Sequence, residues 1–178
     1  MKNFFIPLAL LLALISVNVV ALEEYINVPA LNTVWVERPN QVNDYRLISH
    51  ISSTYGVQLQ KAEEIVKTAT KLGESTFPTK IDILAIIAIE SNFNQFARAK
   101  GSSAKGLMQI LYKPTSFEVE KNLTDGANLL KDYRSRLDID AAVQAYNVGI
   151  GAYLKGARNK DYLNKFKQAK KQLEKNIV

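Results

Sequence analysis

Residues 79–91 read TKIDILAIIAIES, and this stretch is the strongest indication of the fold in the sequence. It is apolar at nearly every position from Ile81 to Ile89, so a helix formed by it has no polar face. A helix that is hydrophobic on every side is buried at the centre of a domain. We therefore expect residues 79–91 to form the central helix of a globular core, with Glu90 near its end.

The flanking sequence predicts more helices and almost no strand. Residues 59–72 place apolar side chains on one helical face, and residues 162–177 repeat them every three or four positions. Only residues 34–37 alternate weakly, as a short extended piece would. Further helices are expected at residues 46–55, 107–111, 125–136 and 139–146. The prediction is one all-α (mainly α) domain with very little or no β-structure.

The first 21 residues have the features of a secretory signal peptide. A start carrying Lys2 precedes an apolar run at residues 4–17, and Val19 and Ala21 suit cleavage after Ala21. The alternative is an uncleaved membrane anchor, which polar residues and a proline within the run disfavour. We expect a periplasmic or secreted protein. Its expected parts are the signal peptide (1–21), an extended N-terminal segment (22–45) and a folded domain (46–178).

Composition limits the chemistry that the chain can perform. The 178 residues include one His, His50, and no Cys. Disulfides, a thiolate nucleophile and Cys-ligated metals are excluded, and a His-based zinc site or Ser-His-Asp triad is disfavoured. We expect neither a cofactor nor a metal, and any catalysis should depend on carboxylate, Tyr, Lys or amide side chains.

The net charge of +6 is concentrated at the C-terminus. Residues 155–178 hold eight Lys and Arg against two Asp and Glu, so the rest of the chain is neutral. Such a basic helix suits peripheral contact with an anionic membrane or wall surface. The alternative is an ordinary solvated helix face.

Glu90 is the candidate catalytic residue. It follows an apolar helix, so its carboxyl group should be partly desolvated and its pKa raised. A carboxyl group that keeps its proton near neutral pH can act as a general acid. The alternative is a Glu that turns to solvent where the helix ends.

Three blocks occur in order: ESNFN at 90–94, GLMQI at 106–110 and AYNVG at 145–149. A looser fourth block, NLTDGA, lies at 122–127. Together they resemble the soluble lytic transglycosylase (SLT) family, which has a goose-type-lysozyme-like fold. The resemblance covers about residues 65–166. It implies that the chain cleaves the bond between N-acetylmuramic acid and N-acetylglucosamine in peptidoglycan glycan strands, leaving 1,6-anhydromuramoyl ends.

By the same resemblance, Glu90 is the catalytic acid and base, and Tyr146 is the tyrosine whose hydroxyl holds it. Met108 and Gln109 are expected to line the cleft, Asn147 to support it and Ser91 to stabilise the helix end. Tyr162 is the nearest match to a tyrosine in the family's last helix. The expected substrate-binding residues are thus Ser91, Met108, Gln109, Tyr146, Asn147 and Tyr162.

The sequence also departs from the family pattern. Gln95 replaces a usual proline, and Ala99 or Lys100 occupies the position of a substrate-binding serine. Ser102 or Ser103 could replace that serine. The segment between Gln109 and residue 122 is shorter than usual.

Three other functions remain open. A goose-type muramidase would use water as the nucleophile, with Glu118 or Glu120 as candidates for a second carboxylate. A non-catalytic peptidoglycan-binding component would belong to a cell-envelope assembly, a secretion or conjugation complex, or a phage apparatus. Nucleic-acid binding by the basic helix is disfavoured, because export removes the chain from most nucleic acid.

Overall fold

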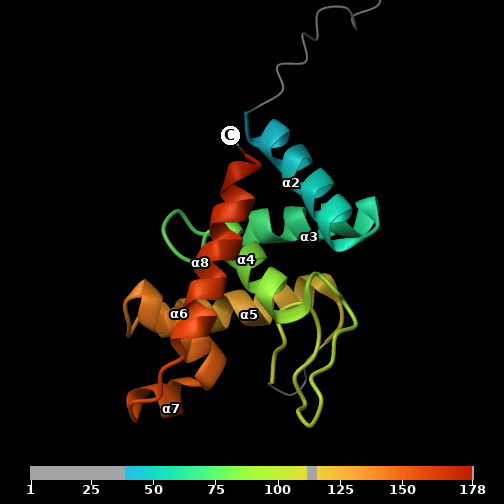
Figure 1. Cartoon of the computed structure of the whole chain (residues 1–178). Helices are drawn as coiled ribbons and strands as arrows, with labels where there is room; N and C mark the ends of the chain where they lie inside the picture. The colour runs from blue at the N-terminus through green and yellow to red at the C-terminus, as the bar shows by residue number, and fades with distance from the viewer. Residues whose placement is uncertain (1–38, 112–115, 178) are drawn as a thin grey trace, which may run out of the picture. The chain divides into compact units, whose positions relative to one another are not determined.

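The computed structural model describes residues 39–111 and 116–177, and 66% of the described residues are helical. Two per cent are strand, and no sheet forms within this part of the chain. The all-α prediction is confirmed. Figure 1 shows the helices, which are α2 (Pro39–Tyr55), α3 (Leu59–Leu72), α4 (Lys80–Ser91), α5 (Val119–Arg134), α6 (Ile139–Val148), α7 (Ile150–Leu154) and α8 (Lys160–Lys175).

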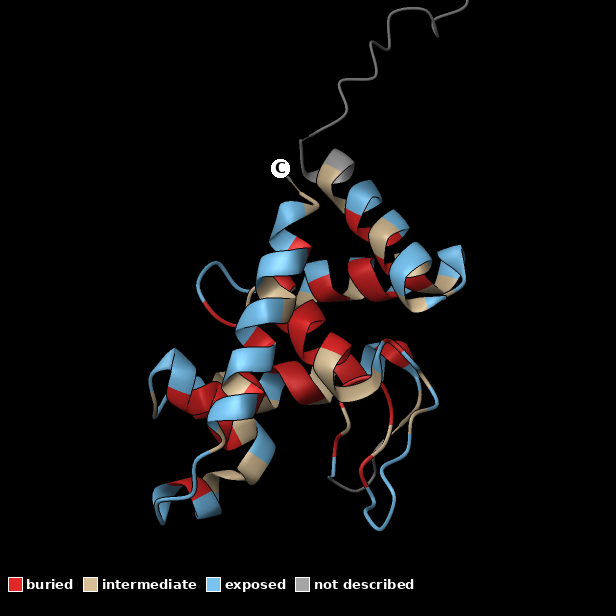
Figure 2. Ribbon diagram, in the orientation of Figure 1, coloured by how far each residue is buried: buried red, intermediate tan, exposed pale blue. Residues whose placement is uncertain are grey.

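Helix α4 is the central helix that the apolar stretch predicts. Residues 81–88 are all buried, and α4 packs against both α3 and α8. Figure 2 shows this helix as the buried centre around which the exposed faces of its neighbours lie. Thr79 and Asp82 begin α4 with a capping box, in which each side chain bonds the other residue's backbone N–H. Asn92 ends it in a left-handed conformation, with φ of 49°.

The two amphipathic predictions are confirmed as well. On α3 the buried residues are Ala62, Ile65, Val66 and Ala69. On α8, Tyr162, Phe166 and Leu173 are buried, and Ala169 packs against the same core. Helix α8 therefore packs against α4 and α6 as part of the core (Figure 1).

One predicted helix is wrong. The predicted helix at residues 107–111 is instead a turn at residues 106–109, flanked by isolated bridges that join Lys105 to Arg98 and to Ile110. Gly106 and Gln109 both have positive φ, 82° and 49°, which is incompatible with a continuing helix. Leu107, Met108 and Ile110 are buried, so their apolar character reflects packing and not helical periodicity.

Several helix boundaries also differ from the prediction. Helix α2 begins at Pro39, so the segment expected to be extended as far as residue 45 is helical over its last part. Proline suits the first turn of a helix, because that position needs no N–H partner. Helix α5 begins at Val119, six residues before the expected start at 125, and the short helix α7 was not predicted.

The signal peptide (1–21), the piece at 34–37 and residues 112–115 lie outside the described residues. Among the residues that are described, no helix combines the length and the hydrophobicity needed to cross a bilayer.

Candidate active site

Glu90 lies at the C-terminal end of α4 and is half-buried. The hydroxyl group of Tyr162, on α8, donates a hydrogen bond to Glu90 Oε1 at 2.6 Å. The packing of α8 against α4 creates this contact between residues 72 positions apart. The carboxyl group that the sequence singles out is therefore held in a defined orientation.

Two opposing effects act on the pKa of Glu90. Burial, the larger one, raises this pKa above its ordinary value, because the charged form loses its water. The hydrogen bond from Tyr162 lowers the pKa, because it stabilises the carboxylate. Burial also raises the pKa of Tyr162 well above its ordinary value, and the charge of Glu90 adds to this rise. Tyr162 therefore keeps its proton and remains a donor, and the sequence-based expectation of a raised Glu90 pKa is confirmed in direction.

Tyr146 has a different partner from the one expected. Its hydroxyl group donates to the carbonyl oxygen of Met108 at 2.7 Å, so the expectation that Tyr146 holds Glu90 by a hydrogen bond is wrong. Burial raises the pKa of Tyr146 well above its ordinary value, and the negative charge of Glu90 raises it further. Tyr162 holds the acid, whereas Tyr146 fixes the neighbouring loop.

Met108 is also placed differently. Its side chain is fully buried, so the expectation that this side chain lines the cleft is wrong. It packs against Gly126 on α5, where a Cβ atom would lie 2.7 Å from Met108 Cε. Only the backbone of Met108 takes part in the site, through its bond from Tyr146.

Gln109 adopts a left-handed backbone conformation that projects its side chain across the loop. Its Nε2 donates to the carbonyl oxygens of Gly106, at 2.8 Å, and Ala97, at 3.1 Å. No residue in the described part of the chain donates to Gln109 Oε1, which leaves this oxygen to accept a bond from a sugar hydroxyl or amide.

Asn122 on α5 organises this loop, a role that the sequence did not reveal. Its buried side chain accepts a bond from Met108 N at 2.8 Å. It also donates to the carbonyl oxygens of Lys105, at 3.1 Å, and Ser116, at 3.0 Å. The only available signal was that Asn122 opens the loosely matched NLTDGA block.

A cavity of about 300 Å³ lies between this loop and helices α5 and α6. It brings Gln109, Tyr146 and Asn147 together, as expected, with Val148 and Gly149 from the same block. The other lining residues are Ile110, Leu111, Leu129 and Tyr133. Asn147 Oδ1 also accepts a bond of 2.7 Å from the side chain of Asn159, just before α8. Parts of the second and third sequence blocks thus form one concave surface, with Tyr146 within electrostatic reach of Glu90.

The remaining candidates have local structural partners or are exposed. Ser91 Oγ donates to the carbonyl oxygen of Ile87 at 3.1 Å, a contact within α4. Ser102 Oγ accepts a bond from Ala104 N at 3.1 Å, and Ser103 is exposed. Glu118 and Glu120 lie at the start of α5, both exposed, and Glu120 forms an ion pair with Lys71 on α3 at 2.6 Å. Across residues 39–111 and 116–177 no three His, Asp or Glu side chains gather as a metal site would require.

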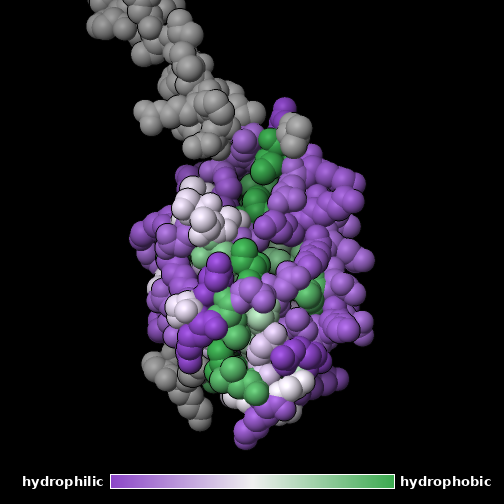
Figure 3. Space-filling view, turned by 90° about the vertical axis from the view of Figure 1, so that its left-hand side faces the viewer, coloured by the Kyte–Doolittle hydropathy of each residue, from purple (hydrophilic) through white to green (hydrophobic). Residues whose placement is uncertain are grey.

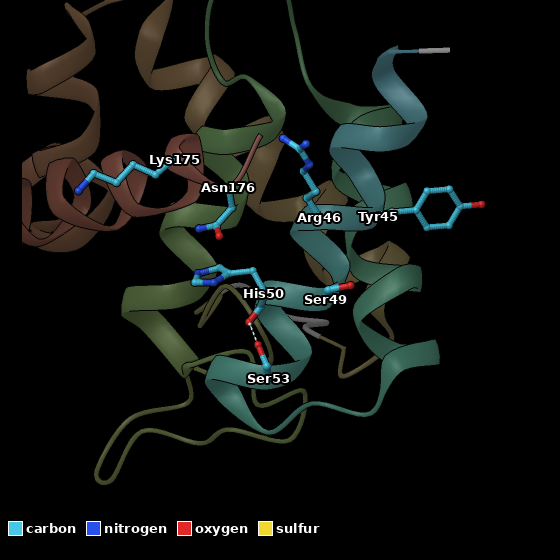
Figure 4. A pocket seen from close by; sticks show the side chains of 7 residues that line it. All are labelled: Tyr45, Arg46, Ser49, His50, Ser53, Lys175 and Asn176. Atoms are coloured by element: carbon cyan, nitrogen blue, oxygen red, sulfur yellow. Dashed lines mark hydrogen bonds between the residues drawn. The ribbon is translucent and has the colours of Figure 1, made fainter. Parts of the chain in front are cut away.

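A second groove, of about 660 Å³, lies between α2 and the C-terminal end of α8 (Figure 4). In this view His50 and Asn176 face each other across the groove, whereas Tyr45 points away from it. None of its lining residues belongs to the sequence blocks, so we place the candidate site at Glu90 and not here.

A comparison with protein families gives a match to the transglycosylase SLT domain over residues 79–169. The match begins at the N-cap of α4 and reaches the middle of α8. It therefore contains Glu90, Tyr162, the loop at residues 105–110 and every residue that lines the cavity beside Tyr146. No curated protein and no solved structure matches the chain.

Proposed function

Because the chain belongs to the transglycosylase SLT domain family, whose activity is directed at peptidoglycan, we propose that it is a lytic transglycosylase. The proposed reaction cleaves the β-1,4 bond between N-acetylmuramic acid and N-acetylglucosamine and leaves a 1,6-anhydromuramoyl end. The observation that carries this proposal is the half-buried Glu90, with a raised pKa and an orienting hydrogen bond from Tyr162.

The first proposed step is general acid catalysis. Protonated Glu90 donates its proton to the glycosidic oxygen, and the bond from this oxygen to the anomeric carbon of the muramoyl residue breaks. The N-acetyl carbonyl oxygen of the same muramoyl residue stabilises the electron-poor anomeric carbon. A raised pKa supports this step, because it increases the fraction of Glu90 that carries a proton at neutral pH.

The second proposed step uses Glu90 as a base. Its carboxylate accepts the proton of the muramoyl 6-hydroxyl group, whose oxygen forms the new bond to the anomeric carbon. Glu90 is then protonated again, and no water is consumed. Most glycosidases need two carboxylates, but this sequence of steps needs one.

Tyr162 supports both steps as a positioning residue. Its hydroxyl group fixes one carboxyl oxygen, so the other oxygen is directed to the substrate. The same bond stabilises the carboxylate that forms after proton donation. The cavity beside Tyr146 supplies Gln109 and Asn147 as groups to bind the sugar on one side of the cleaved bond.

We also propose that the chain is exported to the periplasm or secreted. The support is the sequence of residues 1–21 and the location of the substrate outside the cytoplasm. Fractionation of producing cells, with N-terminal sequencing of the mature protein, tests this. An N-terminus at Leu22 is expected, and retention of Met1 in a cytoplasmic fraction contradicts it.

Mass spectrometry of the products from purified peptidoglycan tests the activity. The wild type should release muropeptides with 1,6-anhydromuramoyl ends, and Glu90→Gln should release none above background. Reducing ends in place of anhydro ends would establish a muramidase instead. Equal release by the wild type and Glu90→Gln, at background level, would leave only a binding role, for which a cell-envelope assembly is the expected partner.

A further inference from the structure

Asn159 lies just before α8 and joins two parts of the candidate site through one side-chain amide. Its Oδ1 accepts a hydrogen bond of 2.9 Å from Tyr162 N and so caps the first turn of α8. Its Nδ2 donates a bond of 2.7 Å to Asn147 Oδ1, in the last turn of α6. Asn147 lines the cavity beside Tyr146, and Tyr162 holds Glu90. Asn159 therefore connects a residue expected to bind the sugar with the residue that orients the acid.

The orientation of both amides follows from their hydrogen-bonding chemistry. A backbone N–H can only donate, so the atom of Asn159 that faces Tyr162 N must be the oxygen. The nitrogen of Asn159 then faces Asn147, which must present its own oxygen. Asn147 Nδ2 is left as the group that donates to a substrate. One contact with the backbone of α8 thus sets the polarity of an amide that lines the cavity.

These contacts form a continuous chain from the cavity to the acid. The chain passes from Asn147 through the planar amide of Asn159 to the backbone of Tyr162, whose hydroxyl group donates to Glu90 Oε1 at 2.6 Å. Tyr162 is the third residue of α8, and the ends of helices fray more readily than their middles. The position of the hydroxyl group therefore depends on how firmly the first turn of α8 is held.

Helix capping alone does not require an amide at this position. Serine and threonine cap helices about as well as asparagine does, but neither side chain offers an N–H group to Asn147. The bond between Asn159 and Asn147 is exposed, so it competes with water and adds little to the stability of the fold. Its main effect is on geometry, because it fastens the start of α8 to the end of α6.

We propose that Asn159 is a positioning residue of the candidate active site, an inference that rests on the proposed function. It holds the amide of Asn147 and the first turn of α8 in one geometry, and it acts on Glu90 through the hydroxyl group of Tyr162. Loss of its amide should therefore affect KM through Asn147 and kcat through Tyr162.

The substitution Asn159→Thr tests the amide while it keeps the cap. Threonine retains an oxygen that can accept from Tyr162 N and loses the group that donates to Asn147. The midpoint of thermal unfolding should stay within about 2 °C of the wild type. For the formation of anhydromuramoyl ends, kcat should fall about fivefold and KM should rise about threefold. The alkaline limb of the kcat/KM profile should move to higher pH, because a weaker bond from Tyr162 raises the pKa of Glu90.

The same substitution in a Tyr162→Phe background shows whether Asn159 acts through Tyr162. The hydroxyl group is already absent there, so Asn159→Thr should lower kcat by less than about twofold, while KM still rises. The matched control is Asn164→Thr, at an exposed position of α8 that does not line the cavity. Its kcat, KM and pH profile should equal those of the wild type. An unchanged kcat in Asn159→Thr, or the same fall in both backgrounds or in the control, would overturn the proposal.

A measurement without substrate separates this inference from the proposed function. The titratable side chains that face Glu90 are Tyr162 on α8 and Tyr146 on α6, and the pKa of each is raised well above its ordinary value. A carbon-13 NMR titration of the Glu90 carboxyl group near neutral pH therefore reports on that group alone. Asn159→Thr should raise its pKa in the same direction as Tyr162→Phe but by less, and Asn164→Thr should leave it unchanged.

The two possible failures are then distinct. If the wild type forms no anhydromuramoyl ends, the proposed function fails, and the NMR titration alone decides the role of Asn159. If the pKa of Glu90 is the same in Asn159→Thr as in the wild type, Asn159 does not position the acid, whatever reaction the chain catalyses.

Discussion

The hydrogen bond from Tyr162 to Glu90 opposes the effect of burial on the acid. Burial favours the protonated carboxyl group, and the tyrosine hydroxyl favours the carboxylate. Glu90 must hold a proton at the start of the proposed reaction and be anionic in its middle. Because burial raises the pKa of Glu90 and the hydrogen bond lowers it, Glu90 can both donate and accept a proton near neutral pH. Tyr162 should therefore affect the rate and also its pH dependence.

The substitution Tyr162→Phe tests the effect of the hydrogen bond on Glu90, because it removes only the hydroxyl group. The change keeps the ring and removes the hydroxyl group that lowers the pKa of Glu90, so that pKa should rise further. Because the reaction starts from protonated Glu90, activity falls as pH rises through this pKa. The alkaline limb of the kcat/KM profile should therefore move to higher pH, while kcat falls about tenfold to a hundredfold, as expected for a lost charge-assisted hydrogen bond.

Tyr153→Phe is the control, because Tyr153 on α7 packs under Arg158 and not against Glu90. Its pH profile should match that of the wild type. A Tyr162→Phe enzyme whose alkaline limb keeps its position would show that the hydroxyl group does not influence the acid.

Sequence reasoning finds Glu90 but assigns its partner wrongly. The apolar run before Glu90 is local information, and it predicts both the burial and the raised pKa. Which of two tyrosines reaches Glu90 depends on the register with which α8 packs on α4, and neither helix contains that information alone. The same holds for Met108, whose burial depends on the absence of a side chain at Gly126.

At the level of elements, the loop at residues 105–110 packs closely against α5, where the side chain of Met108 lies against Gly126. Gly126 lies within α5, where glycine weakens a helix, yet any side chain there would meet Met108. A Cβ atom at Gly126 would also lie 3.1 Å from Met108 Cβ, an atom that cannot move without the backbone. The glycine thus exchanges helix stability for close approach of the loop.

Gly126→Ala should lower the free energy of unfolding by about 1–3 kcal/mol through overpacking. In a Met108→Ala background the obstruction is gone, and the same change should be neutral or stabilise by up to about 1 kcal/mol through helix propensity. Urea denaturation of the four proteins measures the coupling. If Gly126→Ala costs the same in both backgrounds, Met108 is not the reason for this glycine.

The start of α4 is a second place where two helices are joined by specific contacts. Asp82 is buried, accepts bonds of 2.8 Å from both Thr79 N and Thr79 Oγ, and pairs with Lys170 of α8. The capping box thereby also links α4 to α8, the two helices that carry Glu90 and Tyr162.

Asp82→Ala should cost about 3 kcal/mol, because it removes one of the two bonds of the capping box and leaves the part-buried donors of Thr79 and Lys170 without their acceptor. Lys167→Ala removes an exposed ion pair on the same helix and should cost no more than about 0.5 kcal/mol. Chemical denaturation distinguishes the two. Similar small losses would mean that Asp82 contributes no more than a surface charge.

The helices that the sequence predicts well are those whose burial follows a helical period. Residues 59–72 are predicted at both ends, because their apolar face repeats regularly and a glycine follows. Leu107, Met108 and Ile110 are equally apolar, but they are buried in a turn that two positive φ angles and Asn122 hold in place. Local hydrophobicity cannot separate these cases, because it reports burial and not backbone conformation.

At the scale of the whole molecule, α8 combines three roles. It contributes Phe166 and Leu173 to the core, Tyr162 to the active site and six of the eight basic residues of positions 155–178. Removing residues 161–178 would therefore abolish the acid's partner and part of the core together with the charge. A test of the basic surface must replace exposed lysines and leave the helix in place.

The face seen in Figure 3 indicates what kind of surface contact is available. Hydrophilic groups cover most of it, and hydrophobic groups are confined to a narrow band. Contact with a membrane or wall would then depend on charge, which salt screens. On α8, Lys167 and Lys170 are engaged in ion pairs, whereas Lys171 and Lys175 are exposed and have no ion-pair partner among the described residues.

Lys171→Gln/Lys175→Gln should therefore weaken binding to vesicles that contain anionic lipid by about fivefold for each lysine at low salt. Binding to purified cell wall should weaken in the same direction, and the salt dependence of both should become shallower. Co-sedimentation over a series of salt concentrations measures this, and turnover of soluble glycan strands verifies that the active site is intact.

The matched control is Lys67→Gln/Lys71→Gln on α3, which removes the same charge from lysines that pair with Glu63 and Glu120. If the control weakens binding as much, net charge and not the position of α8 determines the contact, and the basic helix has no special role as an anchor.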